Sequence, residues 1–256
     1  MSYLILCAGD RSKHNVALNI LKYFIQEHKR DKKNIFVCVS DNDKDICNFL
    51  KKKKINFINK DIKNFLYDLK PNNYKWLLNI WCPIIYKFEI LKKFKNNLNI
   101  HPSYLPYAKG KDPYVWSVNN NYPLGVTIHE MNEKIDSGKY FIQKKINLDF
   151  PYTGGDVFNH SLKECIELFK NNWKKIRENK IKKKNLKKNK TKTFKRLDLI
   201  NNNLLDLDKK NNLTVKKFIY KILSQDFEFN KLQLKINNYI YDVSLNLKKN
   251  NKKKWK

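Results

Sequence analysis

An amide, an imidazole and a carboxylate that could act together on an acyl group lie close to one another in this chain. Asn99 and His101 come just before Pro102 and Pro106, and Asp136 opens an Asp-Ser-Gly turn. Moving an acyl group onto an amine needs a donor to the oxyanion, a group that handles a proton and a carboxylate that orients the imidazole. Alternate residues of a strand project from one face, so Asn99 and His101 should leave a strand end together. These residues predict acyl transfer, from a loop that the prolines stiffen.

Alternating apolar strands and amphipathic helices precede these residues. The hydrophobic pattern predicts strands over 3–8, 35–39, 55–58, 76–81 and 98–100, helices over 15–26, 43–52 and 61–69, and a loop-to-helix turn from Pro83 to about Phe94. Such alternation is typical of parallel pairing in a doubly wound α/β sheet. Open α/β sheets bind ligands at the carboxyl ends of their strands, and strand 98–100 delivers Asn99 and His101 to that edge.

The second half of the chain divides into several segments. A helix over 113–120, strands over 126–131 and 140–146 and an amphipathic helix over 156–176 complete a first domain, residues 1–180. Residues 181–195 are predicted to form a basic linker, because their composition is polar and rich in lysine. Residues 196–248 are predicted to form a small α+β subdomain of a helix (213–223) and a hairpin (231–236 and 239–247). Residues 249–256 are expected to be a frayed basic tail.

The chain is strongly basic, with 54 Lys and Arg against 24 Asp and Glu and a formal net charge of +30. This charge has two explanations: a surface for nucleic acid or another polyanion, or a lysine-rich composition spread over solvated faces. Only Arg11, Arg30, Arg177 and Arg196 are arginines, and bidentate phosphate recognition favours arginine. A nucleic-acid partner is therefore possible but not favoured.

The spacing of the cysteines and the hydropathy of the chain indicate whether it binds a metal ion and in which cell compartment it lies. The five cysteines are odd in number and none are spaced C-x-x-C, so we expect reduced, buried thiols and no metal. The first residues are too short and too uncharged for a signal peptide, and no apolar run reaches the length of a membrane span. We therefore expect a cytoplasmic protein without a membrane partner.

Three linked motifs bring a family resemblance. The run HPSYLPYAKGKDPYVWSVNNNYPLGVTIHEMNEKIDSGKYFIQ (residues 101–143) resembles the formyltransferases that use 10-formyltetrahydrofolate. That family has an Asn–His–Asp set, HPS-x-LP after the histidine, and GVT-x-H followed by DSG or DTG, in this order. The resemblance, good over 76–146, implies a Rossmann-like formyltransferase domain, 10-formyltetrahydrofolate as co-substrate, and catalytic roles for Asn99, His101 and Asp136.

The same resemblance implies where ligands bind. The loop Trp81-Cys82-Pro83-Ile84-Ile85 corresponds to the pterin pocket, and its apolar walls and backbone polar groups suit a flat heteroaromatic ring. Gly110 and Asp136 are expected beside the cofactor. Four residues are expected near the acceptor, each with ordinary packing as the alternative explanation: Pro113, Tyr114, Trp116 and His129.

Among the relatives, sugar N-formyltransferases fit best. They resemble this chain in a K-G-x-x-P-x-x-W run and in a short tail, which implies a nucleotide-linked amino sugar as acceptor and a homodimer. Methionyl-tRNA formyltransferase is the alternative that the charge supports, although its C-terminal RNA-binding domain is larger. A glycinamide ribonucleotide formyltransferase-like enzyme and a non-catalytic polyanion-binding relative are further alternatives.

Overall fold

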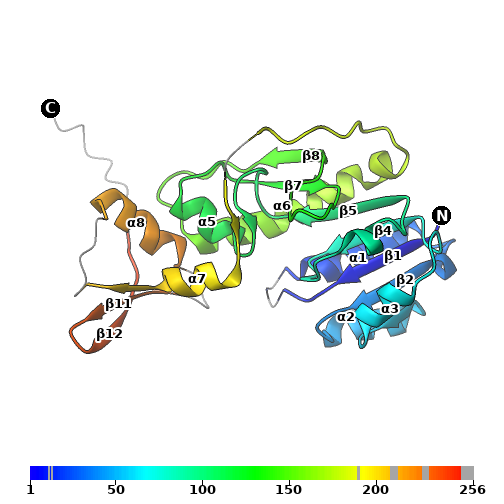
Figure 1. The fold of residues 1–256 in the computed structure, drawn as a ribbon, viewed down its shortest axis with the longest axis horizontal. Helices are drawn as coiled ribbons and strands as arrows, with labels where there is room; N and C mark the ends of the chain where they lie inside the picture. Colours follow the sequence, from blue (N-terminus) through cyan, green and yellow to red (C-terminus); the bar gives the residue numbers. More distant parts are fainter. Residues whose placement is uncertain (11, 13, 189–190, 208–212, 227–230, 249–256) are drawn as a thin grey trace.

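A computed structural model describes the chain except for residues 11, 13, 189–190, 208–212, 227–230 and 249–256. The predicted basic tail, 249–256, lies outside the described residues. Figure 1 shows two regions, a larger one built on a central sheet and a smaller one, from α7 onward, at the opposite end from the N-terminus.

The central sheet has seven strands in the order β3-β2-β1-β4-β5-β7-β8. These strands are β1 (Tyr3–Cys7), β2 (Ile35–Val39), β3 (Asn56–Ile58), β4 (Trp76–Ile80), β5 (Asn96–His101), β7 (Gly125–His129) and β8 (Tyr140–Lys145). β1 to β5 pair in parallel, whereas β7 runs antiparallel to β5 and β8 antiparallel to β7. The predicted α/β fold with a largely parallel sheet is confirmed.

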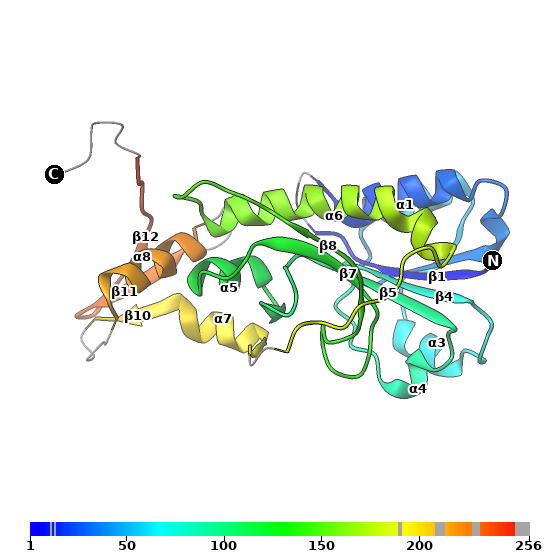
Figure 2. The same ribbon diagram turned by 90° about the horizontal axis from the view of Figure 1, so that it is seen from above.

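Helices cover both faces of the sheet, as Figure 2 shows. They are α1 (Val16–Glu27), α2 (Lys44–Lys53), α3 (Ile62–Asp68), α4 (Phe88–Leu91), α5 (Pro113–Asn119) and α6 (Gly154–Arg177), with a short 3-10 turn, η1 (Lys32–Asn34). α1, α2 and α6 share one core with Tyr3, Ile5 and Cys7 of β1, while α3 and α4 share a second core with Leu4 and Leu6. A strand buried on both faces supplies alternate residues to two cores, which explains its continuous apolar run.

The chain after β4 forms a loop and then a short helix, as expected between Pro83 and about Phe94. Only α4 is helical there, and residues 82–87 are irregular. Trp81 has a left-handed backbone (φ 67°), so the chain turns sharply at the end of β4. The residues that follow are free of the helical pattern and line a cavity described below.

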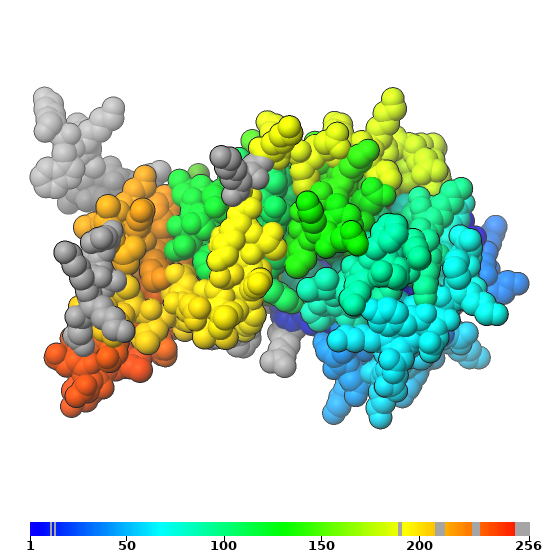
Figure 3. All heavy atoms as spheres, in the orientation of Figure 1, coloured from blue at the N-terminus to red at the C-terminus, as the bar shows by residue number. Residues whose placement is uncertain are grey.

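The smaller region combines helices with a three-stranded sheet. Its elements are α7 (Arg196–Asn203), β10 (Leu204–Asp206), α8 (Val215–Ser224), β11 (Leu232–Ile236) and β12 (Tyr239–Val243). β11 and β12 form the expected antiparallel hairpin, and β10 adds to β11 in parallel. α7 and β10 were not expected from the sequence. Figure 3 shows this region in yellow to red, as a lobe at one end of the molecule.

The stretch predicted to be a basic linker, 181–195, runs back to the larger region. Thr191 donates from its hydroxyl to the carbonyl of Pro106 over 2.7 Å. β9 (Thr193–Phe194) then pairs in parallel with β6 (Lys109–Gly110). The boundaries 1–180, 181–195 and 196–248 remain a prediction, but the contacts bring α7 against the carboxyl edge of the central sheet.

Candidate active site

Three polar side chains form a row across the carboxyl ends of β4, β5 and β7. The strand register places Asn79 beside Asn99, and Asn99 beside His129. Leu98 and Ile100 point into the core that α1 and α6 cover. Asn99 and His101 therefore share the opposite face, as their spacing predicted.

The carboxamide of Asn99 is fixed from both sides. Its Oδ1 accepts a hydrogen bond from Nδ2 of Asn79 over 3.0 Å. Its Nδ2 lies 3.0 Å from Nε2 of His129 and 3.4 Å from Oδ1 of Asp136. Asn99 thus presents its N–H groups to the site and keeps its oxygen away from it.

Asp136 lies between the two histidines. Its Oδ2 accepts the backbone N–H of Gly110 over 2.8 Å and lies 3.5 Å from Nδ1 of His101, while its Oδ1 lies 3.4 Å from Nε2 of His129. Burial by itself would raise the pKa of this carboxyl, but His101, His129 and the Gly110 N–H lower it, so that the net shift is downward. Asp136 is therefore ionised, with charge-assisted partners on both oxygens.

A glycine two residues later lets the Asp136 loop approach β7. A Cβ on Gly138 would lie 1.8 Å from the backbone oxygen of Glu130, well inside van der Waals contact. Any other residue would push the loop outward and move Asp136. The glycine of the Asp-Ser-Gly motif is thus explained by close packing of backbone on backbone.

Both ring nitrogens of His101 face oxygen acceptors. Nε2 lies 3.1 Å from the carbonyl of Ala108, and Nδ1 faces Asp136. Only the protonated ring can donate to both. Burial nevertheless lowers the pKa of His101, outweighing the opposite effect of Asp136. Burial thus favours the neutral ring and Asp136 favours the protonated ring, and this balance suits a group that exchanges a proton during a reaction.

The tautomer of His129 follows from its neighbours. Its Nδ1 lies 2.8 Å from the backbone oxygen of Glu130, an acceptor, so Nδ1 carries the proton. Its Nε2 lies 3.0 Å from Nδ2 of Asn99 and 3.4 Å from Oδ1 of Asp136, so that the neutral ring accepts from the amide and the protonated ring donates to the carboxylate. His129 is 1 % exposed, and it supports the Asn99 amide from the side opposite Asn79.

The proline-marked loop after His101 is held by hydrogen bonds. The Thr127 hydroxyl donates to the carbonyl of Ser103 over 2.7 Å and accepts the N–H of Leu105 over 3.2 Å. The Ser103 hydroxyl donates to the carbonyl of Tyr107 over 2.8 Å. The loop is therefore rigid without a ligand, and it fixes the position of Ala108 against His101.

A cavity of about 1180 Å³ opens over these residues. The predicted site residues that line it are Trp81, Cys82, Pro83, Ile84, Ile85, Asn99, His101, Gly110, Pro113, Tyr114, His129 and Asp136. Loop 81–85 forms an apolar wall, and Ile85 is 69 % exposed. An exposed apolar side chain beside a deep cavity is typical of a ligand site.

Trp116 is the one predicted site residue that does not line the cavity. Its ring stacks on Phe194, with centroids 4.1 Å apart and planes 5° from parallel, and Phe194 lines the cavity in its place. Tyr114 lines the cavity and donates its hydroxyl to Asp112 over 3.2 Å. Burial, followed by the charge of Asp112, raises the pKa of Tyr114, so this phenol is a donor at neutral pH.

The opposite wall is formed around β6, β9 and the start of α7, and it has a cationic edge. Lys111, Lys195 and Arg196 line the cavity and are exposed. Nη1 of Arg196 lies 3.1 Å from both carboxylate oxygens of Asp112. Sequence reasoning missed this wall, because the backbone pairing of β6 with β9 that builds it joins segments more than eighty residues apart.

Asn79 was also missed, although a signal for it is present. β4 otherwise reads as a continuous apolar run, Trp-Leu-Leu-Asn-Ile, and a polar residue in such a strand needs a specific partner.

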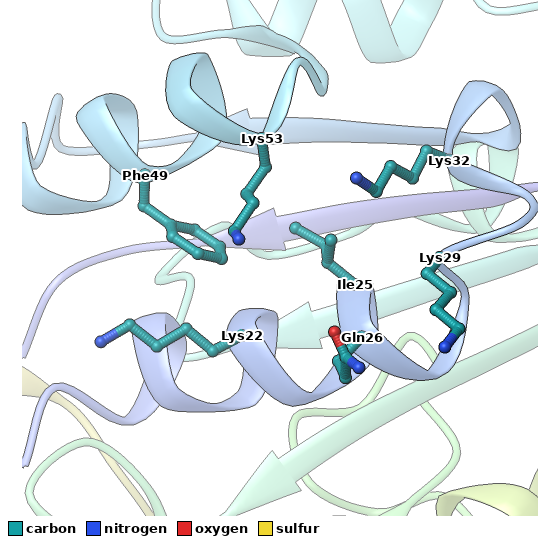
Figure 4. A pocket seen from close by; sticks show the side chains of 7 residues that line it. All are labelled: Lys22, Ile25, Gln26, Lys29, Lys32, Phe49 and Lys53. Atoms are coloured by element: carbon teal, nitrogen blue, oxygen red, sulfur yellow. The ribbon is translucent and has the colours of Figure 1, made fainter.

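A second hollow of about 270 Å³ lies between α1 and α2 (Figure 4). It is lined by Lys22, Ile25, Gln26, Lys29, Lys32, Phe49 and Lys53. Four ammonium groups supply positive charge, but the lining offers no carboxylate, imidazole or thiol to move a proton. The cavity over Asn99 is therefore the candidate active site.

Among the described residues, no three His, Cys, Asp or Glu side chains come together in a way that could hold a metal ion. Within the same residues, no helix is both long and apolar enough to cross a bilayer.

Comparisons with known proteins agree with this geometry. Residues 76–171 match the family model described as formyl transferase. The chain is 33% identical over 61 residues to the dTDP-4-amino-4,6-dideoxyglucose formyltransferase of Mycobacterium tuberculosis, covering 24% of this chain and 26% of that one. It is 33% identical over 99 residues to the methionyl-tRNA formyltransferase of Borreliella afzelii, covering 38% and 30%. Each alignment thus spans less than a third of the curated relative.

The similarity in structure extends over nearly the whole chain. An N-formyltransferase from Helicobacter canadensis, crystallised with folinic acid and dTDP-3-aminofucose, superposes with a TM-score of 0.73 at 25% identity, covering 93% of this chain and 85% of that one. A likely sugar N-formyltransferase from Mycobacterium tuberculosis superposes with a TM-score of 0.74 at 18% identity, covering 97% and 98%. Residues 76–171 are therefore similar to formyl transferase domains, and the chain has the Rossmann-like fold that these formyltransferase structures share.

Proposed function

We propose that this protein transfers a formyl group from 10-formyltetrahydrofolate to the primary amine of a nucleotide-linked amino sugar. The observation that carries the proposal is the convergence of Asn99, His101 and Asp136 on the floor of one cavity. The apolar loop 81–85 borders that floor on one side and Phe194, Lys195 and Arg196 border it on the other.

In the proposed reaction, the neutral amine attacks the formyl carbon of the cofactor. A C–N bond forms, and the carbonyl oxygen becomes an oxyanion that accepts a hydrogen bond from Asn99 Nδ2, while protonated His101 adds positive charge beside it. Asp136 orients His101 and balances its charge. The C–N bond to N10 of the folate then breaks, N10 takes a proton that the amine has lost, and tetrahydrofolate leaves with the amide product formed.

The two walls support two different ligands. Loop 81–85 suits a pterin ring, because it combines apolar side chains with backbone polar groups. Lys111, Lys195 and Arg196 suit a diphosphate, because cations at a cavity edge attract phosphate and Arg can bind it in a fork. The Helicobacter canadensis structure holds both ligand classes, folinic acid and dTDP-3-aminofucose.

Methionyl-tRNA formylation is the second candidate. The net charge of +30 and the Borreliella afzelii relative favour it. Against it, the described residues beyond the domain form a short lobe of helices and a three-stranded sheet, and the superpositions on sugar enzymes extend through that lobe.

The test is release of tetrahydrofolate from 10-formyltetrahydrofolate with a panel of acceptors. The panel holds dTDP-, UDP- and GDP-linked amino sugars, charged initiator methionyl-tRNA and glycinamide ribonucleotide. We expect turnover with one class of nucleotide-linked amino sugar. Turnover with the tRNA alone would replace this proposal by the second candidate, and turnover with none would favour a polyanion-binding protein.

We also propose a homodimer, and a cytoplasmic location where the cofactor is made and used. Exposed apolar side chains gather on the C-terminal hairpin, where Tyr239, Ile240 and Tyr241 are each at least half exposed, and a second copy would cover them. All five cysteines are unpaired and buried, as in proteins of reducing compartments. Light scattering on the purified protein, with Ile240→Asp as the variant, tests the dimer.

A further inference from the structure

We infer that Asn79 is a positioning residue that fixes the orientation of the Asn99 amide and couples it to the cofactor loop. This inference rests on the proposed formyl transfer. It concerns a buried residue that does not itself touch the reacting atoms.

Asn79 has its own orientation dictated by the backbone. Its Nδ2 donates to the carbonyl of Cys82 over 3.2 Å. A carbonyl can only accept, so the NH2 side of the Asn79 amide must face Cys82 and cannot be exchanged for the oxygen side. Asn79 is 7 % exposed, which leaves no room for the side chain to rotate into solvent.

The orientation of Asn79 then determines that of Asn99. The same Nδ2 atom donates its second N–H to Asn99, with 3.0 Å between Asn79 Nδ2 and Asn99 Oδ1. An amide whose oxygen is held in this way must present Nδ2 on its other side, toward His129 and Asp136. The proposed reaction needs a donor at that position, and a rotated Asn99 would offer the growing negative charge an acceptor instead.

An unpaired atom supports a functional reason for Asn79. Its Oδ1 is buried without a hydrogen-bond partner among the described residues. Burying an unpaired polar atom destabilises a fold, and such groups are concentrated where function requires them. The NH2 group of Asn79, in contrast, has two acceptors, the Cys82 carbonyl and Asn99 Oδ1.

The same NH2 group joins the two halves of the site. Cys82 follows Trp81, whose left-handed backbone (φ 67°) turns the chain into loop 81–85. By holding the Cys82 carbonyl, Asn79 fixes this turn at the same time as it fixes Asn99. The cofactor wall and the proposed oxyanion donor are thus set by one side chain.

The decisive variant is Asn79→Asp, with Asn79→Ala beside it. Asp has the same shape but donates nothing, so the Asn99 amide rotates to donate toward residue 79. We expect kcat to fall about 100-fold, the effect of removing one oxyanion donor, while KM for the amino sugar changes less than threefold. Asn97→Asp is the matched control, because Asn97 Oδ1 only accepts, from the Met131 N–H over 2.6 Å, and Asp can do the same; its kcat should stay unchanged.

A double-mutant cycle separates positioning from mere folding. If Asn79 acts through Asn99, Asn79→Ala should lower kcat in the wild-type background and hardly change it in an Asn99→Ala background. Equal losses in both backgrounds would overturn the inference, as would a kcat for Asn79→Asp and Asn79→Ala within threefold of wild type at an unchanged Tm.

An NMR measurement that does not depend on catalytic turnover tests this inference separately from the proposed function. The side-chain amide signal of Asn99, assigned by its loss in Asn99→Ala, should shift in the NMR spectrum of Asn79→Ala and stay in place in Asn97→Asp. An inactive wild type with this shift would refute formyl transfer and keep the orienting role. An unshifted Asn99 signal in Asn79→Ala would refute the orienting role itself.

Discussion

Replacing Asp136 by Asn should stop turnover without unfolding the protein. Asn has the same shape and can still accept the Gly110 N–H, but it removes the charge that faces His101 at 3.5 Å. Coulomb's law at an effective dielectric constant of about 20 gives about 5 kcal/mol for two unit charges at this distance. Relief of the burial penalty of Asp136 offsets part of this loss.

We therefore expect the barrier to rise by about 3–4 kcal/mol, which lowers kcat about 100- to 1000-fold. The assay is tetrahydrofolate release at saturating substrates, with Tm measured in parallel. Tm should fall without loss of the folded state at the assay temperature, because the downward shift of the Asp136 pKa means that the ionised carboxyl stabilises the folded protein. Asp149→Asn makes the same change of charge on an exposed loop residue and should keep wild-type kcat. A kcat for Asp136→Asn within threefold of wild type would refute the reasoning.

Three further perturbations have defined outcomes. Gly138→Ala should lower both Tm and kcat, because its Cβ would lie 1.8 Å from the Glu130 oxygen and displace Asp136; unchanged values would contradict the packing argument. Arg196→Gln should raise KM for the nucleotide sugar about tenfold, as expected for one charge-assisted hydrogen bond, with kcat nearly constant; an unchanged KM measured at low salt would exclude Arg196 from the binding site. Burial and the charge of Arg177 lower the pKa of His28 from 6.5 to about 4, so between these values the unfolded chain binds a proton that the folded chain does not. The free energy of unfolding should consequently fall by up to about 3 kcal/mol as pH drops from 6.5 to 4, and urea titrations of wild type and His28→Gln should differ in this slope.

The sequence predicted the central fold well where hydrophobic periodicity is strong. β2 has the expected bounds, 35–39, and α1 differs from its expected range by one residue at each end. α6 begins two residues earlier than expected, because Thr153 and Asp156 cap it reciprocally. In these elements local propensity and tertiary packing agree.

The sequence did not predict several features of the segments that line the cavity. The loop before α4 was expected, but the left-handed backbone of Trp81 that turns residues 82–87 toward the cavity was not. α7 was missed because its only buried residue is Leu199, which leaves no apolar period to detect. Spacing correctly predicted that Asn99 and His101 share a face. The contact of Gly110 with Asp136, and the position of Phe194 instead of Trp116 in the cavity wall, depend on contacts between distant segments, which spacing does not reveal.

The most direct test of the central claim compares wild type with Asn99→Ala in the release of tetrahydrofolate from 10-formyltetrahydrofolate and a nucleotide-linked amino sugar. We predict turnover by wild type and a kcat about 100- to 1000-fold lower in Asn99→Ala, at an unchanged Tm. Equal rates in the two proteins would show that formyl transfer does not occur at this amide, and no release by folded wild type with any acceptor would contradict the proposed activity altogether.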